Sequence, residues 1–331
     1  MLVAELENEL VGIICGSIKI ATTTGGLRPS SLGYILGLRV SPLHQRRGIG
    51  SSLVLGLEQW FHDNLVDYVY MATEKSNEAS LKLFTYKLGF VAFRTPAILV
   101  NPVGNHLIPI SSSVEIKKVE ISQAECLYRK YMSSTEFFPQ DIDSVLRNKL
   151  SFGTWLAYPR GENWNLSSSS AMSDSPTPRS WAMLSVWNCT MVYKVKVVKA
   201  PWTCVAMRKF SNWIDKFFPW LRVPVVPNVF STFGYYFMYG MQAEGPQAEL
   251  LMSSLCLYVH NMARKSNDCE VIVAEVGGGD VIRSYIPHWK SFSFSEDIWC
   301  IKPLQIEKEE AFLDWTTSPP PPTIFFDPRD L

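Results

Sequence analysis

The segment between residues 34 and 61 constrains the fold most, because it joins a strand pattern to a helix pattern through a glycine-containing turn. Residues Tyr34–Val40 form an apolar run of strand length. After the turn, apolar residues recur at intervals of three and four positions, at Ile49, Leu53, Leu57, Trp60 and Phe61. This spacing predicts a helix with one buried face. We therefore expect a strand, a tight turn and a helix in this order.

The turn places small and basic residues at the predicted start of that helix. The first backbone N–H groups of a helix have no partner within it, and the helix dipole adds partial positive charge there. Gly48 and Gly50 carry no Cβ, so a ligand can approach the main chain closely. Gln45, Arg46 and Arg47 supply side-chain donors beside them. The pattern predicts a pyrophosphate site, and an ordinary turn with a basic rim is the alternative.

Two better-known glycine loops do not match this turn. No Gly-Lys-Ser/Thr follows it, and the three-glycine dinucleotide fingerprint is absent. Gln-x-x-Gly-x-Gly after a strand ending Leu38-x-Val40-x-Pro42 instead resembles the acetyl-coenzyme A (acetyl-CoA) motif of the GCN5-related N-acetyltransferase (GNAT) superfamily. The stretch 77–84, followed by 87–90, resembles that superfamily's Asn-x-x-Ala/Ser-x-x-Leu-Tyr and Lys-x-Gly-Phe.

The order of predicted elements in the first half agrees with this resemblance. A hairpin comes first, and the strand and helix described above follow it. A buried strand at 68–72, a helix at 77–88 and closing strands at 90–93 and 97–100 come next. Members of the superfamily open with a strand and one or two helices before the hairpin. The resemblance therefore implies a first copy of the fold that is truncated at its start.

The same plan recurs in the second half. Patterns of strand, helix, strand, short helix and closing strand occur at 235–240, 245–265, 270–275, 280–289 and 299–301. The predicted fold class is therefore α/β (α+β): tandem GNAT-like mixed sheets flanked by helices, with a truncated first copy and a degenerate second copy. In the second copy Pro246 removes an N–H donor and Glu244 places a negative charge where a phosphate would lie. At ~4 Å and a dielectric of 20, like charges repel by about 4 kcal/mol, which argues against a cofactor there.

These patterns divide the chain into three parts. Residues 1–103 are predicted to be the acetyl-CoA-binding domain. Residues 104–304 are predicted to be the degenerate GNAT-like domain, with a disordered loop at 162–180 that is rich in serine and proline. We also expect a helix within 197–218. Residues 305–331 are a proline-rich C-terminal tail, expected to be an extended, exposed spacer, with a ligand for proline-recognition partners as the alternative.

Four further stretches resemble one plant subgroup of the superfamily, the Hookless-type N-acetyltransferases. They are Trp187-Asn188-Cys189, Phe237-Met238-Tyr239-Gly240, Ile286-Pro287-His288-Trp289-Lys290 and Trp299-Cys300-Ile301-Lys302. This resemblance implies acetyl-CoA-dependent transfer of an acetyl group to an amine, and a role in plant growth and hormone signalling.

The resemblance also implies roles for individual residues. Main-chain groups of the strand around Leu38 and Val40 would bind the pantetheine arm, and one N–H there would polarise the thioester carbonyl. Cofactor binding is expected from Leu38, Val40, Gln45, Arg46, Arg47, Gly48, Ile49, Gly50, Ser51 and Asn77. For Asn77 a simple helix cap is an equal alternative. The general base is assigned to Glu74, whose alternative is a charge at a helix start, with Glu5 and His44 as weaker candidates.

Phe84 departs from the superfamily pattern, because many members carry a tyrosine there that is thought to protonate the leaving thiolate. Phenylalanine has no proton to give. Together with the lost second site, this departure supports an alternative function. The chain would then bind acetyl-CoA as a catalytically weak or inactive regulatory or scaffold protein.

Composition excludes several other classes of function. With 31 basic and 31 acidic residues, the chain gives no electrostatic argument for a nucleic-acid or membrane partner. The seven cysteines are scattered and the five histidines lack ligand spacing, so we expect no metal. No apolar run reaches the about 18 residues of a membrane helix, and no signal-peptide pattern is present. We therefore expect an intracellular protein, cytoplasmic or nuclear, with an unidentified amine acceptor as partner.

Overall fold

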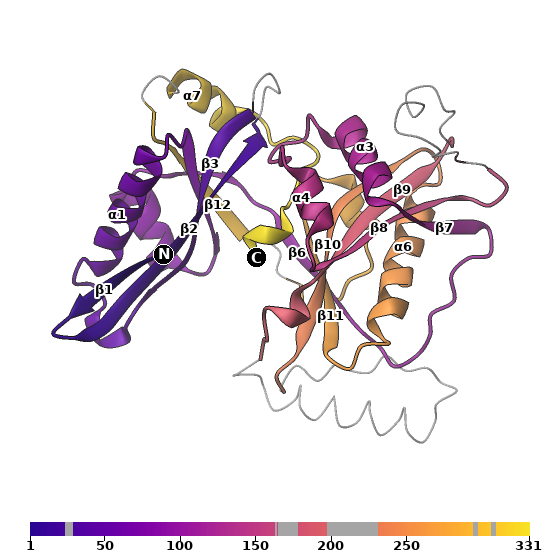
Figure 1. Cartoon of the computed structure of the whole chain (residues 1–331), viewed down its shortest axis with the longest axis horizontal. Coiled ribbons are helices and arrows are strands. Elements are labelled where there is room, and N and C mark those ends of the chain that lie inside the picture. Colours follow the sequence, from indigo (N-terminus) through magenta and orange to yellow (C-terminus); the bar gives the residue numbers. More distant parts are fainter. Residues whose placement is uncertain (24–28, 163, 165–177, 197–230, 294–296, 306–308) are drawn as a thin grey trace.

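The computed structural model describes residues 1–23, 29–162, 164, 178–196, 231–293, 297–305 and 309–331, which form two six-stranded mixed sheets (Figure 1). The first sheet has the order β1 (Leu2–Leu6), β2 (Glu9–Thr22), β3 (Pro29–Val40), β4 (Tyr68–Glu74), β12 (Asp297–Pro303) and β5 (Val91–Arg94). The second has the order β6 (Ala97–Pro102), β11 (Cys269–Val276), β10 (Gly234–Glu244), β9 (Trp181–Asn188), β8 (Ser151–Pro159) and β7 (Val114–Val119). The predicted fold class is confirmed.

Helices cover the sheets. Within the described ranges the helices are α1 (Ile49–Asp63), α2 (Glu78–Leu81), α3 (Ile121–Met132), α4 (Ile142–Arg147), α6 (Ala248–Ala263) and α7 (Glu309–Thr317), and a π-helical turn (Lys82–Lys87) continues α2. On the first sheet, Gly16 and Gly33 leave room for Phe61 of α1, since a Cβ at either glycine would lie 2.8 Å from its ring. On the second sheet, α6 packs on one face and α3 and α4 on the other. No helix in the described ranges is long and apolar enough to cross a membrane.

Two sequence predictions about helices are corrected. Trp60 was expected on the buried face of α1 but is 41% exposed, because Leu57 and Phe61 already fill the stripe that meets the sheet. The helix expected at 280–289 is only a 3-10 turn, Val281–Ser284. The helix predicted within 197–218 lies outside the described residues, as do residue 163 and residues 165–177 of the loop predicted to be disordered.

The two halves exchange strands. The sequence patterns suggested that 97–100 closes the first copy and 299–301 the second. Instead β12 lies between β4 and β5 of the first sheet, and β6 pairs with β11 and forms the edge of the second. In Figure 1, β12 lies among the strands of the first half. An apolar run of strand length specifies that a strand forms, but it does not specify which sheet receives it. As a result, β5 has β12 as its only strand neighbour in the first sheet.

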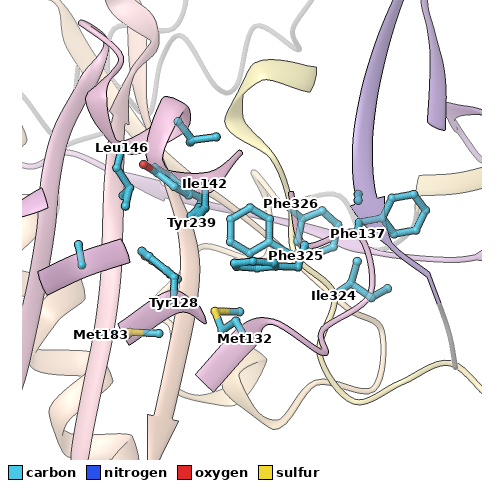
Figure 2. Close-up of a cluster of buried hydrophobic side chains, with 14 of the residues drawn as sticks. Tyr128, Met132, Phe137, Ile142, Leu146, Met183, Tyr239, Ile324, Phe325 and Phe326 are labelled. Atoms are coloured by element: carbon cyan, nitrogen blue, oxygen red, sulfur yellow. The ribbon is translucent and has the colours of Figure 1, made fainter. Parts of the chain in front are cut away.

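The C-terminal segment lies in a core shared by both halves, which corrects the prediction of an exposed spacer. Trp315 of α7 is 2% exposed and packs against Tyr68 and Phe93, with ring centroids 5.2 and 5.6 Å apart. Figure 2 shows Phe325 and Phe326 between Phe137 on one side and Tyr239 of β10 and Tyr128 of α3 on the other. The tail therefore packs as core, because Trp315, Phe325 and Phe326 bury large apolar side chains between the two halves.

One buried histidine predicts a pH dependence of stability. His260 of α6 is 3% exposed, and its Nε2 accepts the backbone N–H of Gly104 at 2.9 Å. Burial lowers the pKa of His260, and the nearby Arg264 acts in the same direction. A depressed histidine pKa means that the unfolded chain binds the proton more readily, so stability falls as pH drops below the unfolded value of about 6.5. We expect the free energy of unfolding of His260→Gln, measured in urea, to change less between about pH 7 and 5 than that of the wild type. An equal change in both proteins would contradict this.

Candidate functional site

A slot opens where the parallel strands β3 and β4 part. The two strands pair only from Leu32–Ile35 with Tyr68–Met71, whereas β3 continues to Val40. Beyond Ile35 the edge of β3 that faces β4 has no partner strand in the described structure. Gly37 adopts φ +65° where the register between β2 and β3 shifts, so a bulge redirects this edge. Main-chain groups of β3 are thus left available to a ligand.

The slot encloses a cavity of about 340 Å³. It is lined by Tyr34, Ile35, Leu36, Gly37, Leu38 and Arg39 of β3, Met71, Ala72 and Thr73 of β4, and Asn77, Ser80 and Phe84 of the following helical segment. Two of the residues predicted for cofactor binding, Leu38 and Asn77, therefore line it. Val40 does not, but it lies with Gln45 on the adjoining groove between β2 and β3.

The start of α1 is open and lies beside the end of β3, since a Cβ built on Gly50 would lie 3.7 Å from Val40. Gly48 precedes the helix with φ +88°, and a Cβ built there would meet no atom within 4 Å. No capping side chain accepts a hydrogen bond from the first backbone N–H groups of the helix, those of Ile49, Gly50 and Ser51. The first backbone hydrogen bond of the helix runs from Ser52 N–H to Gly48 O at 3.0 Å. These N–H groups and the helix dipole can therefore receive an anion.

The basic residues of the turn are exposed. Arg46 and Arg47 have no ion pair or side-chain hydrogen bond within the described part of the chain, so both guanidinium groups are available to a ligand. Gln45 makes only a long contact, 3.5 Å from Nε2 to the carbonyl of Val40. The residues predicted for the pyrophosphate therefore cluster on one surface.

Asn77 combines both alternatives that the sequence left open. Its Oδ1 accepts the N–H of Ser80 at 3.2 Å, which caps α2, while the residue also lines the slot. Phe84 is 1% exposed and packs edge-on against Phe90, at the inner end of the slot. No hydroxyl replaces the expected tyrosine at that position.

The three candidate bases lie at different distances from the slot. Glu74 ends β4, is exposed and accepts a hydrogen bond from Ser76 Oγ at 3.1 Å, but it is not among the residues that line the cavity. Glu5 is exposed on the edge strand β1. His44 lies in the 3-10 turn before α1, with Nδ1 3.5 Å from Ser41 Oγ. Of the three, only Glu74 belongs to a strand that borders the slot.

The corresponding region of the second half is closed. Gly240, with φ +59°, matches the bulge glycine of β3, but the space beside it measures only about 10 Å³ and is filled by Ile324 and Phe326 of the tail. At the start of α6, a Cβ on Gly245 would lie 2.1 Å from Arg179 O, and Ser180 Oγ accepts the N–H of Gln247 at 3.2 Å. The chain's own atoms therefore occupy the places that are open in the first half.

Several carboxylates beside the slot were missed by sequence reasoning. Burial raises the pKa of the Tyr34 phenol, and the nearby carboxylates of Asp330, Glu275 and Asp297 raise it further. The sequence did contain a signal for Glu275, because it is an acidic residue near the end of the otherwise apolar strand 269–276. Among the described residues no group of three or more His, Cys, Asp or Glu side chains is arranged to hold a metal ion.

Comparison with known proteins finds similar acetyltransferases. The model of the Acetyltransferase (GNAT) family matches residues 1–90. Two Arabidopsis thaliana proteins, Probable N-acetyltransferase HLS1-like and Probable N-acetyltransferase HLS1, are 47% and 46% identical over all of this chain and 87% of their own. Acetyl transferase GW6a of Oryza sativa subsp. japonica is 35% identical over 78% of its length. A solved GCN5-related N-acetyltransferase from Anabaena variabilis aligns with 92% of this chain and over 62% of its own length. The alignment has a TM-score of 0.46 and 9% sequence identity.

Proposed function

Because the chain belongs to the GNAT acetyltransferase family, we propose that it transfers an acetyl group from acetyl-CoA to the amine of an acceptor. The observation that carries this proposal is the juxtaposition of an open helix start with a slot between two parting strands. The amides of Ile49, Gly50 and Ser51, with Arg46 and Arg47, would hold the pyrophosphate. The pantetheine arm would enter the slot along the unpaired edge of β3.

The chemical step would use main-chain groups of the first sheet. An N–H on the unpaired edge of β3 near Leu38 would donate to the thioester oxygen and stabilise the charge that develops there. Asn77 would hydrogen-bond the pantetheine arm or the acceptor from the opposite wall. Glu74 remains the sequence-based candidate for the base, next to this wall on β4.

A second function is favoured by one observation. Phe84 fills the inner end of the slot, so no hydroxyl there can protonate the departing thiolate. A protein that binds acetyl-CoA but transfers the acetyl group weakly or not at all would serve as a regulator or scaffold. The two functions share the binding site and differ in turnover.

Binding of coenzyme A is expected to depend on Gly48. At a concentration of 100 times its Kd, coenzyme A should stabilise the wild-type chain by about 2.7 kcal/mol, measured as a rise in thermal midpoint. Gly48→Glu should abolish this rise, because it places a carboxylate among the amides that would receive the phosphates. Arg47→Ala should weaken the binding measured by calorimetry.

The control must separate charge from backbone strain, because Gly48 has positive φ. Gly89 also has positive φ, +75°, with no atom near a built Cβ, but it lies outside the slot. Gly89→Glu should therefore cost stability yet keep the coenzyme A response. If wild type does not respond to coenzyme A, or if Gly48→Glu responds fully, the proposed binding site is wrong.

A further inference from the structure

The proposed path of the cofactor gives the slot an outer and an inner end. The pyrophosphate would lie at the start of α1, which follows the end of β3. The pantetheine arm would then run along the edge of β3 from Val40 toward lower residue numbers. The slot ends where β3 and β4 begin to pair, at Ile35 and Met71. The acyl group at the tip of the arm would therefore face this inner end.

Large side chains close the inner end on both faces of the sheet. Toward α1, the cavity is lined by Ile35, Met71 and Phe84, which belong to the buried core of the first half and are 3%, 4% and 1% exposed. Toward the second half, the closing side chain is Tyr34, which also lines the cavity. Packed side chains give way to extra methylene groups only at a cost in free energy. The slot should thus end just beyond a short acyl group.

Tyr34 packs against an aromatic ring on the neighbouring strand. It lies opposite Tyr70 in the register of β3 with β4, next to the last pair before the strands part. The two rings stack with centroids 4.7 Å apart and planes 26° apart. Tyr70 is fully buried and also packs against Trp299 of β12 and against Phe137, with centroids 5.6 and 5.1 Å away. Tyr34 therefore rests on a ring that is itself tightly packed.

The C-terminal segment holds Tyr70 by its hydroxyl group. Tyr70 Oη donates a hydrogen bond to Asp330 Oδ2 at 2.6 Å, and Asp330 forms an ion pair with Lys19 of β2. The adjacent Arg329 donates from both terminal nitrogens to the carboxylate of Asp141, at 2.6 and 2.9 Å. Asp141 is the residue that precedes α4 in the second half. Residues 329 and 330 thus connect the wall of the slot to the second half.

We propose that Tyr34 limits the acyl chain of the donor to an acetyl group, and that Tyr70 and Asp330 position Tyr34 for this role. This selectivity rests on the proposed acetyl-CoA site and adds a determinant of its specificity. An acetyl group would end against the phenol ring of Tyr34, whereas each further methylene group would have to displace that ring from Tyr70. The hydrogen bond and ion pair of Asp330 oppose such a displacement, so the C-terminal segment contributes to the choice of acyl donor.

The test compares the binding of acetyl-CoA and butyryl-CoA to the full chain by calorimetry, a measurement that needs no acceptor. Wild type should bind butyryl-CoA about 10- to 200-fold more weakly than acetyl-CoA, because the added methylene groups do not fit. Tyr34→Ala should narrow this ratio by about 10-fold or more, whereas Tyr34→Phe, which keeps the ring, should retain it. Unacylated coenzyme A is the reference ligand for each variant, because it has no acyl group to meet the ring.

Two further variants test the positioning of Tyr34. Tyr70→Phe keeps the ring but loses the hydrogen bond to Asp330, and Asp330→Asn removes the ion pair with Lys19 at nearly constant side-chain size. Both should lower the preference for acetyl-CoA, by a smaller factor than Tyr34→Ala does. Tyr86→Phe is the matched control, because Tyr86 is 88% exposed and does not line the slot. It should keep the wild-type preference.

Each other outcome overturns a defined part. If wild type binds acetyl-CoA and butyryl-CoA equally, or if Tyr34→Ala keeps the wild-type ratio, the role of Tyr34 is wrong and the proposed binding site stands. Tyr34→Leu provides the same test should the alanine variant fail to fold. If only Tyr70→Phe and Asp330→Asn keep the wild-type ratio, the positioning role is refuted and the limit set by Tyr34 remains. If wild type binds no form of coenzyme A, the proposed binding site itself is wrong.

Discussion

Residues 1–103, expressed without the rest of the chain, are expected not to fold into a cooperative domain. Their sheet would lack β12, which lies between β4 and β5 and contributes Trp299, Cys300 and Ile301 to the buried core. Without β12, β5 has no strand partner and β4 has one bare edge. Co-expression with residues 104–331 should restore a soluble complex with a single urea-unfolding transition.

The counterpart fragment gives the comparison. Residues 104–331 alone lack β6, which occupies only the edge of the second sheet, so this fragment should retain more structure than 1–103 in circular dichroism. A cooperative transition in the isolated fragment 1–103 would contradict the expectation. It would also support the division at residues 103 and 104 into two independent domains, which remains a prediction.

Arg94→Ala is expected to lower the free energy of unfolding by about 3–5 kcal/mol, because it leaves a buried carboxylate without its cation. Arg94 of β5 donates from Nε and Nη2 to both oxygens of Glu136, at 2.9 and 2.8 Å, with both side chains 1% exposed. Trp315 of α7 donates its indole N–H to the same carboxylate. The cluster therefore ties the first sheet, the second half and the tail together.

An exposed pair of the same kind serves as the control. Lys82 and Glu78 form an i,i+4 pair at 2.9 Å with side chains 68% and 76% exposed. Lys82→Ala should shift the urea midpoint far less, because solvent screens an exposed ion pair. Equal shifts of the urea midpoint for Arg94→Ala and Lys82→Ala would show that the buried cluster is dispensable, contrary to our expectation.

The open start of α1 and the slot in the first half were largely predictable because their determinants are local. Gly48 and Gly50 lie within one turn, and the periodicity that follows fixes the helix start beside them. Leu38 and Asn77 could be placed at the slot because the strand of Leu38 directly precedes the glycine turn and the helix that Asn77 caps closely follows β4. Phe84 was recognised as a departure by its position in a motif.

The carboxylates of Asp297 and Glu275 could not be placed in this way. Each lies roughly two hundred residues along the chain from the strands that it faces, and no periodicity encodes that distance. The tail was misjudged for the same reason. Its prolines indicate an extended segment, but whether Phe325 and Phe326 are exposed depends on the space that the two sheets leave between them.

The sequence by itself determined the order of strands and helices, the open helix start and the loss of that site in the second half. These features follow from residue type and spacing within short segments, where backbone geometry leaves few choices. Only the tertiary structure decided which sheet takes β6 and β12, where the C-terminal segment packs, and which groups close the second-half region that corresponds to the slot. Those outcomes depend on contacts between distant segments, whose energies arise from mutual packing in space and leave no local pattern along the chain.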